Sequence, residues 1–183
     1  SMIPNQTGKD DWATPQYIVD WATAHLGIDG VGFELDAAAR ADTSKGAAFF
    51  GVGGVCEDAF AARWDVRGEF TTVWCNPPYS RVGGGLAKWC ARMQAASELE
   101  GCIVVGLFFA RTETVAWQDS VSKAAEVYLI RGRVAFIDPA TGNSPGPAPA
   151  PSAIVIWRPG DLGPPAYQCL DLRAMASTTK EKK

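Results

Sequence analysis

The stretch FTTVWCNPPY, residues 70–79, joins an apolar β-like run to a loop that has almost no backbone donors. Pro77 and Pro78 carry no backbone N–H, so carbonyl groups and the side-chain oxygen of Asn76 are the polar atoms left to face a ligand. In open α/β sheets, ligands bind beyond the carboxyl ends of the strands. The pattern therefore predicts a strand followed by a loop suited to an exocyclic amino group, although Asn and Pro also form ordinary turns.

This loop has the groups needed to activate a poor nucleophile. The amino nitrogen of adenine shares its lone pair with the ring, and two acceptors, the Asn76 oxygen and the Pro77 carbonyl, would draw it toward tetrahedral geometry. Tyr79 would offer an aromatic face to a base that has left the helical stack. We therefore expect chemistry at an amino group held by this loop.

Asn76-Pro77-Pro78-Tyr79 resembles the catalytic motif of S-adenosylmethionine-dependent amino methyltransferases, and its Asn is similar to that of N6-adenine enzymes, whereas cytosine-N4 enzymes usually carry Ser. The remaining matches resemble small phage-type DNA N6-adenine methyltransferases (Dam-like), which methylate double-stranded DNA. They follow the order of that family from Asp11 to Trp157: residues 11–15, 33–39, 57–60 with Trp64, 76–79, 107–114 with Trp117, 132–136 and 151–157.

The resemblance implies site residues of three kinds. The catalytic residues would be Asn76, Pro77, Pro78 and Tyr79. Contacts to S-adenosylmethionine would come from Trp12, Thr14, Pro15, Asp36, Ala37, Ala38, Asp58 and Asn76. The glycine-rich loop that usually follows the first strand of such enzymes is replaced here by Ala37-Ala38-Ala39. Two of the cofactor contacts have alternatives. Asp36 could instead cap its own turn, and Glu57 could contact the cofactor in place of Asp58.

Net charge is −3, which is unfavourable for a DNA-binding protein, so a local basic face must compensate. Candidate DNA contacts are Ser80, Arg81, Arg111, Arg131, Arg133 and Ser152. Lys88 and Arg92, four residues apart on an expected helix, are interpreted as surface charges.

The composition fits one compact enzyme domain. The chain has 183 residues, of which 47% are hydrophobic and 20% charged. The five cysteines form no Cys-x-x-Cys pair, which favours reduced thiols, and no metal site is expected. The single histidine, His25, is interpreted as structural. With no membrane-length apolar run, we expect a soluble cytoplasmic protein. The resemblance implies a bacterial host cell and a gene carried by a phage or prophage.

Alternating helical and apolar segments predict an α/β fold: a Rossmann-like, mostly parallel sheet with helices on both faces. Thr14 is the expected N-cap of a helix that begins at Pro15 and ends at Gly27. Further helices are expected at 86–97 and 114–125, and strands at 33–36, 47–50, 70–75, 102–109, 125–130, 133–137 and 153–157.

The expected domain organisation is an extension over 1–10, a methyltransferase domain over 11–160 and a tail over 161–183 with a disordered end. A proline-rich loop over 138–152 could serve target recognition or be a plain connector. Three alternatives to DNA methylation stay open: an RNA adenine methyltransferase, a protein glutamine amide methyltransferase, and a catalytically silent DNA-binding relative.

Overall fold

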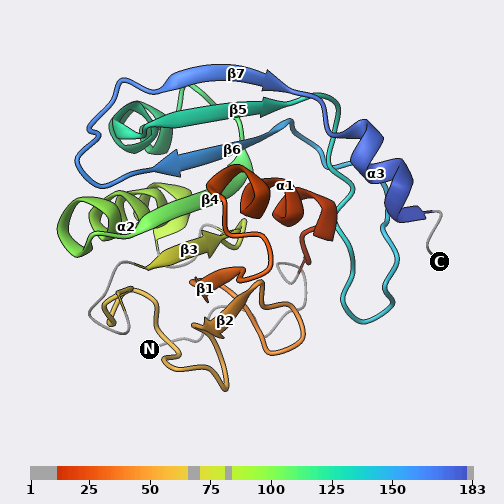
Figure 1. Cartoon of the computed structure of the whole chain (residues 1–183), viewed down its shortest axis with the longest axis horizontal. Coiled ribbons are helices and arrows are strands. Elements are labelled where there is room, and N and C mark those ends of the chain that lie inside the picture. The colour runs from red at the N-terminus through yellow and green to blue at the C-terminus, as the bar shows by residue number, and fades with distance from the viewer. Residues whose placement is uncertain (1–11, 66–70, 81–83, 181–183) are drawn as a thin grey trace.

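The computed structural model describes residues 12–65, 71–80 and 84–180. Within these ranges the chain forms one seven-stranded sheet of order β2-β1-β3-β4-β6-β5-β7, with β2 and β7 at its two edges (Figure 1). The strands are β1 Phe33–Asp36, β2 Gly46–Phe49, β3 Thr72–Cys75, β4 Ile103–Phe109, β5 Glu126–Ile130, β6 Ser152–Trp157 and β7 Ala166–Leu170. The first four strands run parallel, β6 is antiparallel to both β4 and β5, and β7 is parallel to β5. The predicted α/β, mostly parallel sheet is confirmed.

Helices cover both faces of this sheet. Along β3, Val73 and Cys75 pack in the hydrophobic cluster that contains α2 (Gly85–Glu100), whereas Trp74 packs in the cluster that contains α1 (Gln16–Leu26). Alternate residues of a strand point to opposite faces, so both faces of a central strand must be apolar. None of the helices in the described ranges is long and apolar enough to cross a membrane.

The start of α1 differs from the prediction. The helix begins at Gln16 with Pro15 in the capping position, and no side chain caps it. The prediction that Thr14 is the N-cap is therefore wrong, because its hydroxyl bonds elsewhere. The predicted end is confirmed: Gly27 has a φ of 69°, a left-handed conformation that glycine adopts without steric cost.

The C-terminal end of α1 is tied to the sheet through β5. His25 Nε2 lies 2.7 Å from a carboxylate oxygen of Glu126, and Arg158 donates to the other oxygen at 2.6 Å. The Trp21 ring stacks on His25 with ring centroids 4.9 Å apart. These contacts give the single histidine a structural position.

The helix predicted over 114–125 is replaced by a π-helical turn, η2 (Ala116–Ser120), and a 3₁₀ turn, η3 (Val121–Lys123). The Ser122 hydroxyl donates to the Gln118 carbonyl at 2.6 Å. Bonds of this kind, together with β-branched residues, weaken a regular helix.

Residues 133–137 do not form the predicted strand. Gly132, with a φ of 76°, turns the chain away from β5, and Ile137 forms only an isolated bridge with Ala13.

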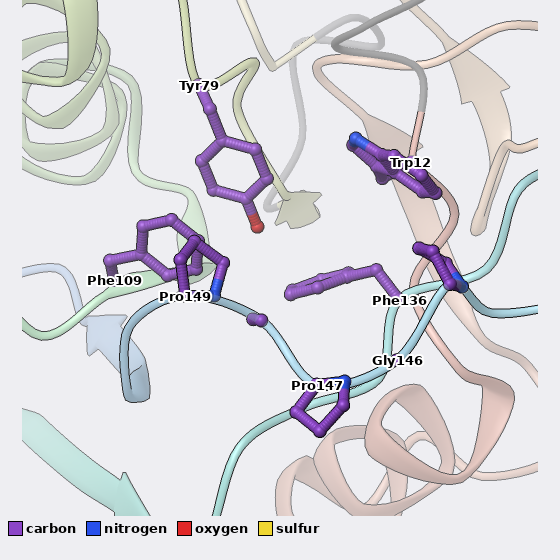
Figure 2. Close-up of a pocket in the computed structure, with 9 residues that line it drawn as sticks. Trp12, Tyr79, Phe109, Phe136, Gly146, Pro147 and Pro149 are labelled. Carbon is purple, nitrogen blue, oxygen red and sulfur yellow. The ribbon is translucent and has the colours of Figure 1, made fainter.

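The proline-rich segment ends at Pro151, one residue earlier than predicted, and Ala148 donates its N–H to the Val134 carbonyl at 2.8 Å. Figure 2 shows Phe136 and this segment on the side of the cavity opposite Tyr79.

Residues 161–183 were expected to form a tail outside the domain. Instead, β7 (166–170) pairs along its length with β5, and α3 (Arg173–Lys180) follows it. The side chains of β7 (Ala-Tyr-Gln-Cys-Leu) are mostly exposed and show no strict alternation of apolar and polar residues, so its sequence gave no clear strand signal, whereas its backbone pairs with β5 on one side. Residues 181–183 lie outside the described ranges.

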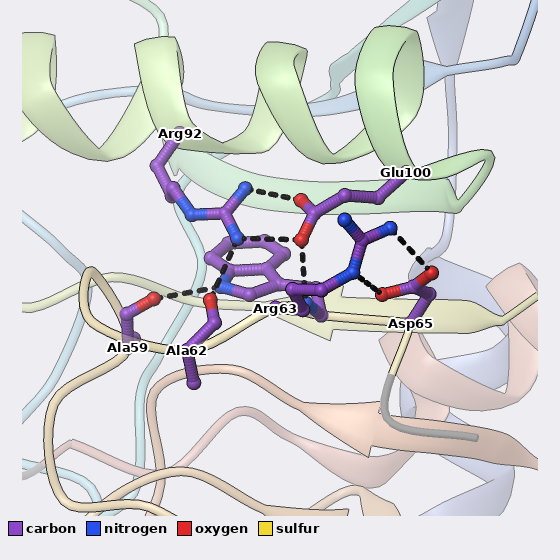
Figure 3. Close-up of polar contacts among 7 residues, drawn as sticks. Ala59, Ala62, Arg63, Asp65, Arg92 and Glu100 are labelled. Carbon is purple, nitrogen blue, oxygen red and sulfur yellow. Dashed lines mark hydrogen bonds and ion pairs between the residues drawn. The ribbon is translucent and has the colours of Figure 1, made fainter. Parts of the chain in front are cut away.

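A buried ion pair fixes the segment between β2 and β3 to α2. Arg92 and Glu100 are paired at 2.6 Å, with side chains 15% and 7% exposed, so the prediction that Arg92 is a surface charge is wrong. Glu100 also accepts the backbone N–H of Trp64 at 2.9 Å, and Arg92 donates to the Ala62 carbonyl at 2.8 Å (Figure 3). The Trp64 indole lies under the Arg92 guanidinium and donates to the Ala59 carbonyl.

Replacement of Arg92 by Gln should destabilise the fold strongly, because Glu100 would then be a buried carboxylate without its cation. Breaking a buried pair costs about 3–5 kcal/mol, which for a chain of this size corresponds to a fall of about 10 °C in the melting midpoint. Arg63→Gln is the matched control, because the neighbouring Arg63 side chain is 68% exposed. Thermal unfolding should separate the two variants, and equal midpoints would contradict the structural role of Arg92.

Candidate active site

The predicted catalytic loop lies at the carboxyl end of β3, in the middle of the parallel half of the sheet. Asp36 is paired with Trp74 in the β1–β3 register, and Cys75 with Gly106 in the β3–β4 register. The carboxyl ends of three adjacent strands therefore meet at one edge, and Asn76 follows directly after the middle strand. This is where open α/β sheets bind ligands.

The Asn76 side chain is held at both ends of its amide. Its Nδ2 donates to the Thr14 hydroxyl oxygen at 3.1 Å, and its Oδ1 accepts from the Tyr79 hydroxyl at 3.4 Å. Asn76 is partly buried, Thr14 is only 3% exposed, and Pro77 between strand and tyrosine is buried. The structure thus brings the catalytic candidates Asn76 and Tyr79 together with the cofactor candidate Thr14, which lies more than sixty residues earlier in the sequence than Asn76.

Tyr79 lines an aromatic cavity of about 270 Å³. Its other walls are Trp12, Phe109, Phe136 and residues 145–149 of the proline-rich segment, and Figure 2 shows these side chains around one space. Pockets for drug-sized ligands hold roughly 300–1,000 Å³. This cavity is therefore on the scale of a single aromatic ligand.

One face of the Tyr79 ring is already covered. Phe109 stacks on it with centroids 4.5 Å apart and planes inclined by 8°, and Phe136 meets it edge-on at 5.9 Å. Burial raises the pKa of the Tyr79 hydroxyl well above its usual value. The hydroxyl stays protonated at neutral pH and acts as a donor.

Asp36 is buried at the end of β1, with an exposed fraction of 3%. Its two carboxylate oxygens accept the backbone N–H groups of Ala38, at 3.2 Å, and Lys45, at 2.9 Å. Burial nevertheless raises the pKa of Asp36 to about 6. The capping role considered for Asp36 is therefore present, and a nearby cation would stabilise its ionised form.

The other cofactor candidates are divided between two places. Trp12 reaches the cavity, and Pro15 is buried beside Thr14 at the start of α1. Ala37 is buried after β1 and donates its N–H to the Trp74 carbonyl at 2.9 Å. Asp58 lies on the exposed surface and accepts the N–H of Phe60 at 2.9 Å, and its neighbour Glu57 is exposed too. No hydrogen bond or ion pair among the described residues joins Asp58 to the Asn76 corner.

The candidate DNA contacts have very different environments. Arg111 is exposed just after β4, with its guanidinium 5.6 Å from the Phe109 ring centroid, and Ser80 is half-buried next to Tyr79. Arg131 lies 3.8 Å from Asp171, and Arg133 donates to the Ala148 carbonyl at 3.2 Å. Arg81 lies outside the described residues.

Ser152 does not fit its predicted role. It is 1% exposed at the start of β6, where it pairs with Phe109, and its hydroxyl has no hydrogen-bond partner in the described structure. A side chain so deeply buried cannot contact DNA on the protein surface.

Sequence reasoning missed Phe109 and Phe136 as cavity walls. Phe109 ends an apolar run that predicts only a buried strand, and Phe136 was placed in a strand that does not form. The proline-rich segment was suspected of a target-recognition role, and its prolines do line the cavity. Phe136, two residues before that segment, was the available signal, and Phe109 had none.

Comparison with known proteins identifies the family of this chain. The family model described as DNA N-6-adenine-methyltransferase (Dam) matches residues 2–179. A DNA N-6-adenine-methyltransferase of Haemophilus phage HP1 (strain HP1c1) is 28% identical over 155 residues, which cover 84% of this chain and 82% of the phage protein. No solved structure matches significantly. Because the family model covers almost the whole chain and the mixed, mostly parallel sheet is consistent with a methyltransferase fold, the chain belongs to the Dam family of DNA N6-adenine methyltransferases.

Proposed function

We propose that this protein binds S-adenosylmethionine and transfers its methyl group to the N6 amino group of an adenine that has been flipped out of double-stranded DNA. The observation that carries this proposal is the position of Asn76 and Tyr79, which lie beside an aromatic cavity at the carboxyl end of β3. A base inside a duplex cannot reach such a cavity without leaving its stack.

Asn76 and Pro77 would activate the amino group. The Asn76 Oδ1 and the Pro77 carbonyl would each accept one N–H of adenine, which turns the nitrogen lone pair toward the methyl donor. The cofactor supplies an electrophilic methyl group on a positively charged sulfur. The amino nitrogen held by Asn76 and Pro77 would form the new N–C bond as the methyl group leaves sulfur with the C–S electron pair, and the amino group would lose one proton to water.

Tyr79 would hold the base by stacking. Because Phe109 covers one face of the Tyr79 ring, the base would occupy the cavity on the side that Phe109 leaves open, near Phe136 and Trp12. The Tyr79 hydroxyl would release Asn76 Oδ1 when the substrate amino group arrives, since that bond is long at 3.4 Å.

The residues present suit a cationic cofactor. Asp36 is a buried carboxylate whose pKa is raised by burial, so a further cation beside it would favour its ionised form, and it ends the strand next to the one that leads into Asn76. Asp36 would therefore face the positively charged end of S-adenosylmethionine, while Trp12 and Pro15 would border the same ligand. Ala37 and Ala38 have side chains small enough for close approach of a ligand to the backbone.

DNA would lie across the mouth of the cavity. Arg111 is the candidate best placed to meet a phosphate there, because it is exposed and adjacent to Phe109. The proline-rich segment borders the same cavity, which supports a role in target recognition.

Transfer of labelled methyl groups tests the function directly. The protein is incubated with radiolabelled S-adenosylmethionine and with DNA, RNA or a protein fraction, and the modified nucleic acid is digested to nucleosides. We expect label in N6-methyldeoxyadenosine. Label in RNA or in protein amides would redirect the assignment to those substrates, and DNA binding without cofactor binding in calorimetry would indicate a silent relative.

Asn76→Ala should abolish transfer but leave cofactor binding nearly intact, because it removes the amide that orients the amino group and not the carboxylate of Asp36. Loss of a positioned polar group of this kind costs about 10²–10³ in kcat. Single-turnover methylation measures the rate and calorimetry the affinity for S-adenosylmethionine. Undiminished turnover would refute the role given to Asn76.

Tyr79→Ala should weaken capture of the base, whereas Tyr79→Phe should be far less harmful. Stacking of a base on an aromatic ring contributes about 1–3 kcal/mol, and the ring face, which Phe retains, provides it. Binding of DNA with an abasic site or a mismatch at the target position, compared with intact duplex, reports the capture step. Equal losses in both variants would show that the hydroxyl, not the ring, carries the function.

The affinity for S-adenosylmethionine should rise with pH across the titration of Asp36. The folded pKa of about 6 lies above the usual value of 3.8, so the carboxyl is mostly neutral at pH 5 and ionised at pH 7.5. If only the ionised form binds the cation, affinity at pH 5 should be about tenfold weaker than at pH 7.5. Calorimetry of Asp36→Asn should show a weak affinity without this rise, and an unchanged pH profile in that variant would exclude the contact.

A further inference from the structure

The Thr14 hydroxyl has an interaction that helix formation does not explain. It does not cap α1, and it accepts a hydrogen bond from Asn76 Nδ2 at 3.1 Å. We propose that Thr14 is a positioning residue that holds the Asn76 amide with its oxygen toward the substrate. This inference rests on the proposed function of Asn76 and assigns the residue that makes that function possible.

The orientation of the amide matters because its two ends have opposite hydrogen-bonding character. An amide oxygen accepts, whereas an amide nitrogen only donates. If Asn76 were turned over, its NH₂ group would face the NH₂ group of adenine, donor against donor. Substrate activation therefore requires one of the two orientations.

The need for Thr14 is greatest during the reaction itself. In the free protein, the Tyr79 hydroxyl donates to Asn76 Oδ1. Once the substrate amino group takes Oδ1, the Nδ2 group still needs an acceptor in a partly buried place. The Thr14 oxygen supplies it, and without it the amide would leave a donor unsatisfied or turn over.

Thr14 is well fixed for this task. The residue before it, Ala13, exchanges two backbone hydrogen bonds with Ile137, at 2.8 and 3.0 Å, and the residue after it, Pro15, leads into α1. Thr14 itself is 3% exposed. Its hydroxyl is thus presented to Asn76 from a buried corner formed by two distant parts of the chain.

The test compares Thr14→Val with Thr14→Ser. Valine has nearly the shape of threonine but no hydroxyl, and serine restores the hydroxyl without the methyl group. For Thr14→Val we expect kcat to fall by about tenfold to a hundredfold, the size expected for one unsatisfied buried amide. The affinity for S-adenosylmethionine and the melting midpoint should change little, and Thr14→Ser should regain most of the lost turnover.

Thr72→Val is the matched control. Thr72 is 8% exposed on β3, and its hydroxyl also accepts one N–H, from Glu34 at 3.3 Å, but it does not touch Asn76. This variant should show a similar change in stability to Thr14→Val and keep its turnover.

Three results would overturn the inference: full turnover in Thr14→Val, loss of cofactor affinity as its main effect, or a Thr14→Ser variant as impaired as Thr14→Val. Asn76→Ala, measured in parallel, separates this inference from the function itself. If Asn76→Ala is inactive while Thr14→Val is fully active, only the positioning role of Thr14 fails. If Asn76→Ala is fully active, the proposed function of the loop fails as well.

Discussion

The proline pair after Asn76 is the constraint on which this site depends. A strand that continued past Cys75 would present N–H groups to its neighbours, but Pro77 and Pro78 have none, so the backbone must leave the sheet at this point. The departing chain carries Tyr79 back over the strand ends, where its hydroxyl reaches Asn76 and its ring lies on Phe109. The same prolines that end the strand therefore place Tyr79 beside the cavity.

The rest of the fold supplies rigid support to that corner from several directions. The α1 side contributes Thr14, the proline-rich segment closes the far wall of the cavity, and β4 supplies Phe109. On the opposite face of the sheet, the Arg92–Glu100 pair attaches the segment before β3 to α2. Packed elements of this kind restrict the movement of a catalytic loop, which favours precise placement of its polar groups.

The chain carries a net negative charge, whereas DNA, the substrate of its family, is itself an anion. The positions of the arginines therefore matter for DNA binding. Several arginines that could have formed a basic face are paired with carboxylates instead: Arg92 with Glu100, Arg131 with Asp171 and Arg158 with Glu126. Arg111 differs, because it is exposed next to the aromatic cavity. Affinity for the duplex would then come from few phosphate contacts close to the reacting base, together with capture of that base by stacking.

The sequence by itself determined the parts of this protein that short-range chemistry controls. Three features follow from the conformations that their own residues allow. They are the Asn-Pro-Pro-Tyr loop after an apolar strand, the glycine that ends α1, and the run of β4 that is apolar on both faces. Tertiary structure alone decided that the Thr14 hydroxyl bonds to Asn76 and does not cap α1. It also decided that the rings of Phe109 and Phe136 pack against Tyr79, and that β7 pairs with β5 at the edge of the sheet. These features depend on contacts between residues far apart in the chain. Local propensity carries no information about such distances, so only the packed sheet could reveal which side chains meet.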